Sequence, residues 1–140
     1  KAYLPGWDPT ERDYDHLTLD FSHASTANQQ SLDLAKAWGP RLRHIHLTDG
    51  SGSAKDEHMV PGRGDQQAAK VLQHLAEVDF AGHVVLEVNT RKADSRAKRE
   101  QDLAESLAFS RLHLTAPIHP DYAVDGRGVA QALTSGAGSV

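Results

Sequence analysis

The sequence lacks cysteine altogether, and it has no apolar stretch long enough to span a bilayer. Without cysteine there can be no disulfide, thiolate metal site or cysteine nucleophile, so any bound metal must have nitrogen and oxygen ligands. The formal net charge of −4 over 140 residues provides no overall attraction to nucleic acid. Hydrophobic residues make up 39% and charged residues 24%, which is typical of a globular chain. These properties argue against membrane and nucleic-acid partners.

Neither end of the chain carries a strong structural pattern. The first residues, 1–6, include no initiating Met and no apolar stretch of a signal peptide. This start favours a piece from the interior of a longer, cytoplasmic protein. Residues 1–16 are predicted to form a loop that enters the fold. Residues 115–140 are rich in Gly, Ser, Ala and Pro and are predicted to form a flexible, disordered tail without a catalytic role.

The middle of the chain alternates between strand and helix patterns. The last predicted helix, at about residues 94–114, carries an apolar stripe of Leu103, Leu107 and Leu114, which we expect to face the core. This strand–helix order, repeated three times, predicts a parallel sheet with right-handed crossovers. Strands are predicted at about residues 17–21, 42–47 and 83–88, and helices at about residues 28–38, 66–77 (capped by Asp65) and 94–114.

Three strand–helix units are too few for a complete fold of this kind. An open three-stranded parallel sheet leaves two edges and one face uncovered. A closed barrel of eight such units, the TIM barrel, needs about 250 residues. We therefore predict an α/β fold in which residues 17–114 form the carboxyl-terminal three βα units of a (β/α)₈ TIM barrel. The missing amino-terminal barrel half would be the structural partner of this chain.

Each predicted strand ends on a residue that binds hard metal ions: Asp20, then His46, then Glu87. The carboxyl ends of barrel strands lie at one rim, where barrel active sites are found, so we expect these side chains to converge on one divalent ion. Carboxylate and imidazole ligands suit Mn, Mg, Co, Fe or Zn and leave the choice open. A buried carboxylate after an apolar run, as at Glu87, is costly unless it is paired or bound to a cation.

These residues also have simpler interpretations. Asp20 could cap the following turn, with His23 on the surface. Glu87 could pair with Arg91. His44 lies two residues before His46 and therefore on the same face of the strand, where a buried inner layer is expected.

The loop between the second and third strands adds further candidates. Asp56 and His58 are additional metal ligands, although their Gly-rich loop could equally be a lid or an exposed turn. Arg63 lies between two glycines ahead of a helix, where it could help to bind a phosphate or simply belong to a tight turn. Asp49 could orient a ligand, but capping of the loop is the favoured role.

The order and spacing of these motifs resemble the carboxyl-terminal part of the xylose-isomerase-like barrel superfamily. That superfamily includes sugar phosphate isomerases and epimerases, ketose 3-epimerases and endonuclease IV. The resemblance covers about residues 14–114. It is carried by residues 19–23 (LDFSH), 44–49 (HIHLTD), 56–65 (DEHMVPGRGD) and 84–87 (VVLE).

The resemblance implies a metal-dependent isomerase or epimerase that acts on a sugar, a sugar phosphate or a similar polyol. The reaction would be proton transfer next to a carbonyl through a metal-stabilised enediolate. In that branch one ion is held by Glu, Asp, His and Glu, and Asp20, His46 and Glu87 match the last three, whereas the first Glu is absent here. Glu87 would also be a catalytic acid or base, and His23 would assist at the substrate. His58 or Arg63 would bind the substrate as well, and the isolated chain is expected to be inactive.

Two alternatives stay open. Endonuclease IV binds three zinc ions, and residues 56–64 resemble its loop for the third zinc, while Asp20, His23, His46 and Glu87 also have counterparts there. That likeness implies a zinc-dependent enzyme of abasic-site DNA repair, and the dispersed positive charge argues against it. The chain alone leaves one ion or three undecided. The other alternative is a non-catalytic, truncated barrel.

Overall fold

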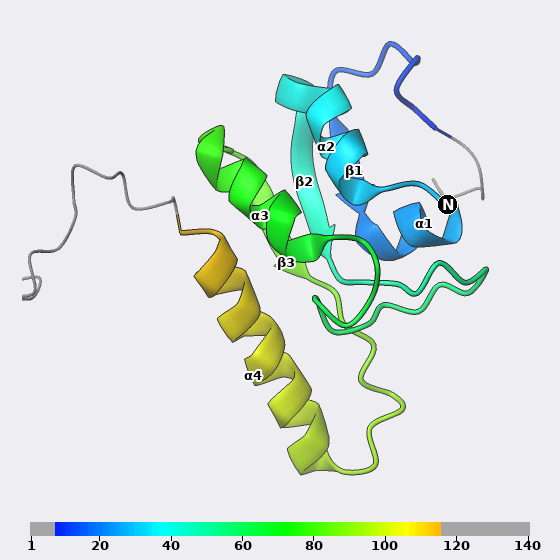
Figure 1. Cartoon of the computed structure of the whole chain (residues 1–140), viewed down its shortest axis with the longest axis vertical. Coiled ribbons are helices and arrows are strands. Elements are labelled where there is room, and N and C mark those ends of the chain that lie inside the picture. Colours follow the sequence, from blue (N-terminus) through cyan, green and yellow to red (C-terminus); the bar gives the residue numbers. More distant parts are fainter. Residues whose placement is uncertain (1–7, 116–140) are drawn as a thin grey trace, which may run out of the picture.

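The computed structural model describes residues 8–115. Figure 1 shows how its helices gather around three strands. Residues 8–16 contain no helix or strand, and the predicted tail lies outside the described residues except for Thr115. The elements along the chain are β1 (Leu17–Asp20), α1 (Phe21–Thr26), α2 (Ser31–Trp38), the 3-10 helix η1 (Gly39–Arg41), β2 (Leu42–Leu47), α3 (Ala68–Glu77), β3 (His83–Leu86) and α4 (Arg96–His113).

The three strands form one parallel sheet in the order β1-β2-β3. In this register Asp20 lies opposite His46, and His46 lies opposite Val85. The backbone N–H of Glu87 donates to the Leu47 carbonyl at 3.1 Å, so the pairing of β2 and β3 continues one residue past β3. The predicted α/β fold with three parallel βα units of a partial TIM barrel is confirmed.

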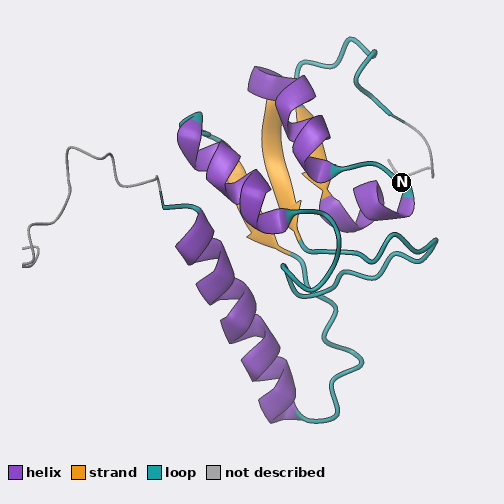
Figure 2. Ribbon diagram, viewed as in Figure 1, coloured by secondary structure: helices purple, strands orange, loops and turns teal. Residues whose placement is uncertain are grey.

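One face of the sheet forms the hydrophobic core. Helices α2 and α3 lie over this face (Figure 2). Leu19, Ile45 and Leu47 point into it and are 1%, 0% and 0% exposed. They pack against apolar side chains of α3, among them Val71 and Leu72. Burial of one such side chain is worth about 1.5–3 kcal/mol, so this face stabilises the relative placement of strands and helices.

The opposite face of the sheet is more polar and more open. His44 and His46 share it, as their spacing predicts, and their ring centroids lie 5.2 Å apart. Val85 of β3 is 45% exposed on the same face. In a complete barrel this face would line the interior.

The region after β1 differs from the prediction of a single helix over residues 28–38. The Asp20 carboxylate accepts the backbone N–H groups of Ser22 and His23, so it caps α1 directly at the end of the strand. Asn28 then takes a left-handed φ of +55°, and the chain turns before α2 begins at Ser31. The short helix was missed because its start depends on Asp20 serving as both strand end and cap.

The helix predicted to be capped by Asp65 begins later, at Ala68, and the cap prediction is wrong. Gln67 occupies the cap position with a left-handed φ of +53° and no side-chain cap. The Asp65 carboxylate instead accepts hydrogen bonds from Ser25 and Gln66. The predicted core residues of this helix, namely Ala68, Val71, Leu72 and Leu75, are buried.

The apolar stripe expected along the last helix is also corrected. Leu103 and Leu107 are 47% and 43% exposed, although Leu114 does pack against the core. Helix α4 packs against α3 and extends beyond the sheet (Figure 1), with a buried face that carries Asp102, Ser106 and Ser110. This polar face can be buried because its polar groups have partners. The two serine hydroxyls donate to carbonyls within α4, and Asp102 accepts a hydrogen bond from Arg63. None of the helices in residues 8–115 is long and apolar enough to cross a membrane.

Candidate metal centre

The carboxyl ends of the three strands bring a group of ligand-type side chains together. Asp20 is the last residue of β1, His46 lies one residue before the end of β2, and Glu87 follows β3 directly. Each offers one nitrogen or oxygen, and the three atoms lie within 4.8 Å of one another. The parallel register therefore places the three residues at one rim of the sheet.

The two carboxylate oxygens of Asp20 have different roles: one accepts hydrogen bonds from the backbone, and the other faces the histidines of the cluster. Oδ1 accepts the backbone N–H groups of Ser22 at 2.9 Å and of His23 at 3.1 Å. Oδ2 faces three imidazoles, with His46 Nδ1 at 3.0 Å, His58 Nε2 at 3.6 Å and His23 Nδ1 at 3.7 Å. The residue is only 7% exposed, so its charge is held in place at the centre of the group.

His46 lies between two carboxylates. Its Nδ1 is 3.0 Å from Asp20 Oδ2 and 2.7 Å from Glu87 Oε2. A neutral imidazole carries one N–H, which can satisfy only one of these two oxygens fully. A cation among the three atoms would neutralise both carboxylates, and one nitrogen with two carboxylate oxygens is a normal donor set for Mn, Fe, Co or Zn. The residues present therefore fit a divalent ion.

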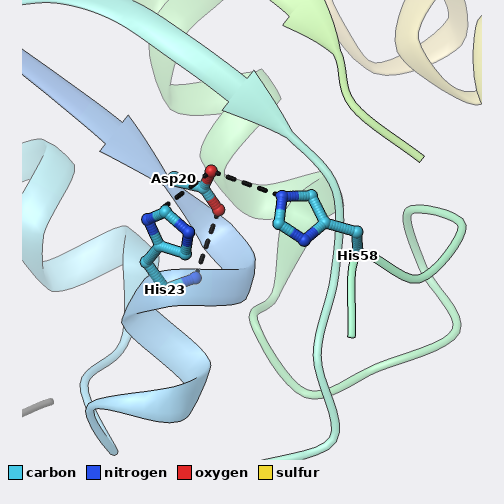
Figure 3. A group of neighbouring side chains, drawn as sticks. All are labelled: Asp20, His23 and His58. Atoms are coloured by element: carbon cyan, nitrogen blue, oxygen red, sulfur yellow. Dashed lines mark hydrogen bonds and ion pairs between the residues drawn. The ribbon is translucent and has the colours of Figure 1, made fainter. Parts of the chain in front are cut away.

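A second group of possible ligands shares Asp20 with the first. Figure 3 shows His23 of α1 and His58 of the loop between β2 and α3 on either side of the Asp20 carboxylate. One atom from each of Asp20, His23 and His58 again lies within 4.8 Å of the others. His58 Nε2 also lies 3.5 Å from Glu87 Oε1, which links the two groups. The arrangement could hold a second cation beside the first.

Asp56 contacts both histidines of this second group. Its Oδ1 lies 2.9 Å from His58 Nδ1, and its Oδ2 lies 3.3 Å from His23 Nε2. A carboxylate that accepts one ring N–H of a histidine leaves the other nitrogen available for a metal. The side chain of Asp56 is 44% exposed, so it lies at the outer border of the group.

Arg63 lies away from this cluster, against α4. Its guanidinium pairs with Asp102 at 3.0 Å and with Glu105 at 2.6 Å. These carboxylates, Glu105 first, raise the pKa of Arg63. The ammonium of Lys98, followed by Arg63, lowers the pKa of Asp102. The arginine thus fastens the glycine-rich loop to α4.

Asp49 organises the loop from beneath. It is 0% exposed, and its carboxylate accepts backbone N–H groups from Gly50 and Gln66 through Oδ1 and from Gly62 through Oδ2. Gly64 has to be glycine at this point because a Cβ there would overlap the Asp49 carboxylate. The favoured interpretation of Asp49 as a capping residue for the loop agrees with these contacts.

Sequence reasoning missed two buried polar residues near the site. Ser22 donates its hydroxyl to Asp56 and accepts the backbone N–H of His58. Gln66 accepts the hydroxyl and backbone N–H of Ser31 and so joins the loop to α2. Serine and glutamine are ordinary surface residues, and only the position of Ser22 between two candidate ligands in LDFSH could have suggested its place.

The comparisons with known proteins agree with this architecture. A family model described as a xylose isomerase-like TIM barrel matches residues 11–113. An uncharacterized protein of Mycobacterium tuberculosis is 55% identical over 113 residues, which are 81% of this chain and 40% of that protein. An uncharacterized protein of Mycobacterium leprae is 51% identical over a stretch of the same length. The chain thus spans about two fifths of these curated relatives.

A solved structure gives the same picture. The crystal structure of a D-tagatose 3-epimerase-like protein superimposes with a TM-score of 0.51 and 27% sequence identity, over 75% of this chain and 40% of that one.

Proposed function

The chain belongs to the xylose isomerase-like TIM barrel family, and from that membership we propose that the intact protein is a metal-dependent isomerase or epimerase of a sugar or sugar phosphate. The convergence of Asp20, His46 and Glu87 at one rim of the sheet carries this proposal. The likeness to an epimerase-like structure supports the reaction class. Because the chain covers only two fifths of its relatives, further ligands would come from the other part of the barrel.

Asp20, His46 and Glu87 would hold the divalent ion, and His58 and Asp56 are further candidates. The ion, Mn, Mg, Co, Fe or Zn, would supply Lewis-acid polarisation of the substrate carbonyl. Glu87 is the best placed acid or base because its side chain is 48% exposed and can reach both solvent and a bound substrate. It would accept or return the proton on the carbon next to that carbonyl.

The histidines of the second group would position the substrate. His23 is 35% exposed and His58 14% exposed at the side chain, so both have a face toward the open side of the cluster. Their ring nitrogens can donate to or accept from sugar hydroxyls. Arg63 would take part in binding a substrate phosphate only after it gives up an ion pair with Asp102 or Glu105.

A matched pair of variants tests this proposal. His46→Ala in the intact protein should lose divalent metal, measured by elemental analysis after dialysis, together with epimerase activity on a panel of ketoses and ketose phosphates. His44→Ala removes an imidazole from the same strand face two residues away and should keep its metal. Equal metal content in the two variants, or a wild type without any divalent metal, would refute the proposal.

The second ligand group favours one alternative, a zinc-dependent enzyme that cleaves DNA at abasic sites. Two groups that share Asp20 could place two cations side by side, which is an arrangement suited to phosphodiester hydrolysis. More than one zinc per intact protein, together with cleavage of a duplex that contains an abasic site, would favour it over the isomerase.

If residues 1–140 neither bind a divalent ion nor turn over a sugar when the intact protein does both, the isolated chain is an inactive piece of the barrel.

A further inference from the structure

We propose that Ser22 is a positioning residue that holds His58 in the orientation it needs to act as a metal ligand. The inference rests on the proposed function, since it assumes that His58 faces a bound cation. It assigns a role to a side chain that neither binds the ion nor touches the substrate. The argument follows from the contacts of Ser22, the backbone of His58 and the ring of His58.

Ser22 connects three of the candidate ligands at once. Its backbone N–H donates to Asp20 Oδ1 at 2.9 Å. Its hydroxyl donates to Asp56 Oδ1 at 2.8 Å and accepts the backbone N–H of His58 at 3.0 Å. The residue is 0% exposed, so water cannot replace these bonds. A hydroxyl is required because the same oxygen acts as donor and acceptor.

The backbone of His58 needs this support. Its φ is +48°, a left-handed conformation that is unfavourable for a residue with a Cβ. Two hydrogen bonds hold it there: the N–H donates to Ser22, and the carbonyl accepts the Asn89 N–H at 2.8 Å. A strained backbone held by its surroundings beside a group of ligands is typical of a pre-organised functional site. Without Ser22, one of the two restraints is lost.

The ring of His58 is oriented through the same serine. Asp56 Oδ1, fixed by the Ser22 hydroxyl, lies 2.9 Å from His58 Nδ1 and selects the tautomer with the proton on that nitrogen. Nε2 then presents a lone pair to Asp20 Oδ2 at 3.6 Å and Glu87 Oε1 at 3.5 Å. A lone pair directed at two carboxylates is repulsive, and a cation among them would remove this repulsion. The view in Figure 3 shows the His58 ring directed at Asp20 in this way.

Ser25 provides a matched control. It lies one turn further along α1, is 2% exposed, and its hydroxyl also holds the loop by accepting the backbone N–H of Gly52 at 2.8 Å. Its hydroxyl contacts Gly52 and Asp65, whereas the hydroxyl of Ser22 contacts Asp56 and His58. Ser25→Ala therefore removes a buried hydroxyl from the same helix and loop without changing the support of His58.

The test is a Co²⁺ titration of the intact, metal-free protein, followed by the visible absorption of the ion. Ser22→Ala should weaken Co²⁺ binding by at least about tenfold, the effect expected when an outer partner of a ligand is lost. It should also change the absorption band as an imidazole leaves the ion. Ser25→Ala should bind Co²⁺ like the wild type. Amide hydrogen exchange should show faster exchange at His58 in Ser22→Ala only.

Each possible result supports or overturns the proposed role of Ser22. If Ser22→Ala frees the His58 amide but binds Co²⁺ like the wild type, Ser22 does not position a ligand. Should Ser22→Ala fail to fold, Ser22→Gly removes the same hydroxyl without adding a new ligand atom, and a folded Ser22→Gly with wild-type affinity overturns the inference. A wild type that takes up no Co²⁺ overturns both this inference and the proposed function, whereas wild-type binding unaffected by Ser22 overturns this inference alone.

Discussion

The two faces of the three-stranded sheet differ in how complete they are. On the helix-covered face, Ile45 is 0% exposed among apolar neighbours, whereas Val85, on the other face, is 45% exposed. The helices of this chain are sufficient to bury the apolar side chains of the covered face. The other face presents Asp20, His44 and His46, which need neighbours that can balance charge and hydrogen bonds. The fold is thus stabilised by one face, and the proposed metal ligands lie on the other, at its carboxyl rim.

The largest effect is expected when the central residue of the proposed metal site is changed without altering the hydrophobic core. Asp20→Asn retains an oxygen that can cap α1 but replaces Oδ2 by an amide N–H₂. We expect Co²⁺ affinity of the intact protein to fall by more than about 100-fold, beyond the usual effect of losing an outer partner. Isothermal titration measures the affinity. Thermal unfolding of the metal-free protein should change little, and a large drop there would mean that Asp20 serves the fold more than the site.

The converse substitution, Ile45→Ala, should harm the fold and spare the site. Truncation of a fully buried aliphatic side chain typically costs about 2–5 kcal/mol of unfolding free energy. Urea unfolding of the 140-residue chain would measure this loss. Val85→Ala, on the open face of β3, should cost less than about 1 kcal/mol in the same chain because its side chain is already half exposed. Equal losses would show that both faces are covered.

The loop between β2 and α3 should become less stable when its buried carboxylate, Asp49, is changed. Asp49→Asn would turn an amide group toward backbone N–H donors, and one buried donor would be left without a partner. Such a group costs about 1–3 kcal/mol. The midpoint of thermal unfolding should fall accordingly. Asp33→Asn, on the exposed side of α2, is the control and should leave the midpoint unchanged.

The smallest effect is expected at the contact between the loop and α4. Lys98 and Arg63 lower the pKa of Asp102, so the ionised form is favoured in the folded state. Its contribution is complete above the ordinary aspartate pKa of about 4 and is lost as the pH falls through the lowered pKa of the folded state. In wild-type protein the urea midpoint should therefore decline slightly more in acid than in Asp102→Asn. Identical acid profiles would mean that the ion pairs contribute nothing to stability.

Much of this arrangement was predictable because strands and ligands follow short-range patterns. Strand β2 was predicted with its correct bounds, and the three strand-end residues lie together because a parallel register leaves them no other place. Leu103 and Leu107 misled the prediction for α4, since periodicity identifies an apolar stripe but not which neighbour will cover it. Ser22 was missed because its role depends on a loop residue 36 positions away, and no local pattern records such a pairing.

The different roles of the two Asp20 oxygens have a consequence for redesign of the proposed metal site. One oxygen starts a helix and the other faces the cluster, so exchanging this residue for a softer or longer ligand would alter backbone and ion preference together. The Glu87 side chain contacts His46 and His58 and approaches the cluster from a half-exposed position. Attempts to change the metal preference of the proposed site should therefore begin at Glu87.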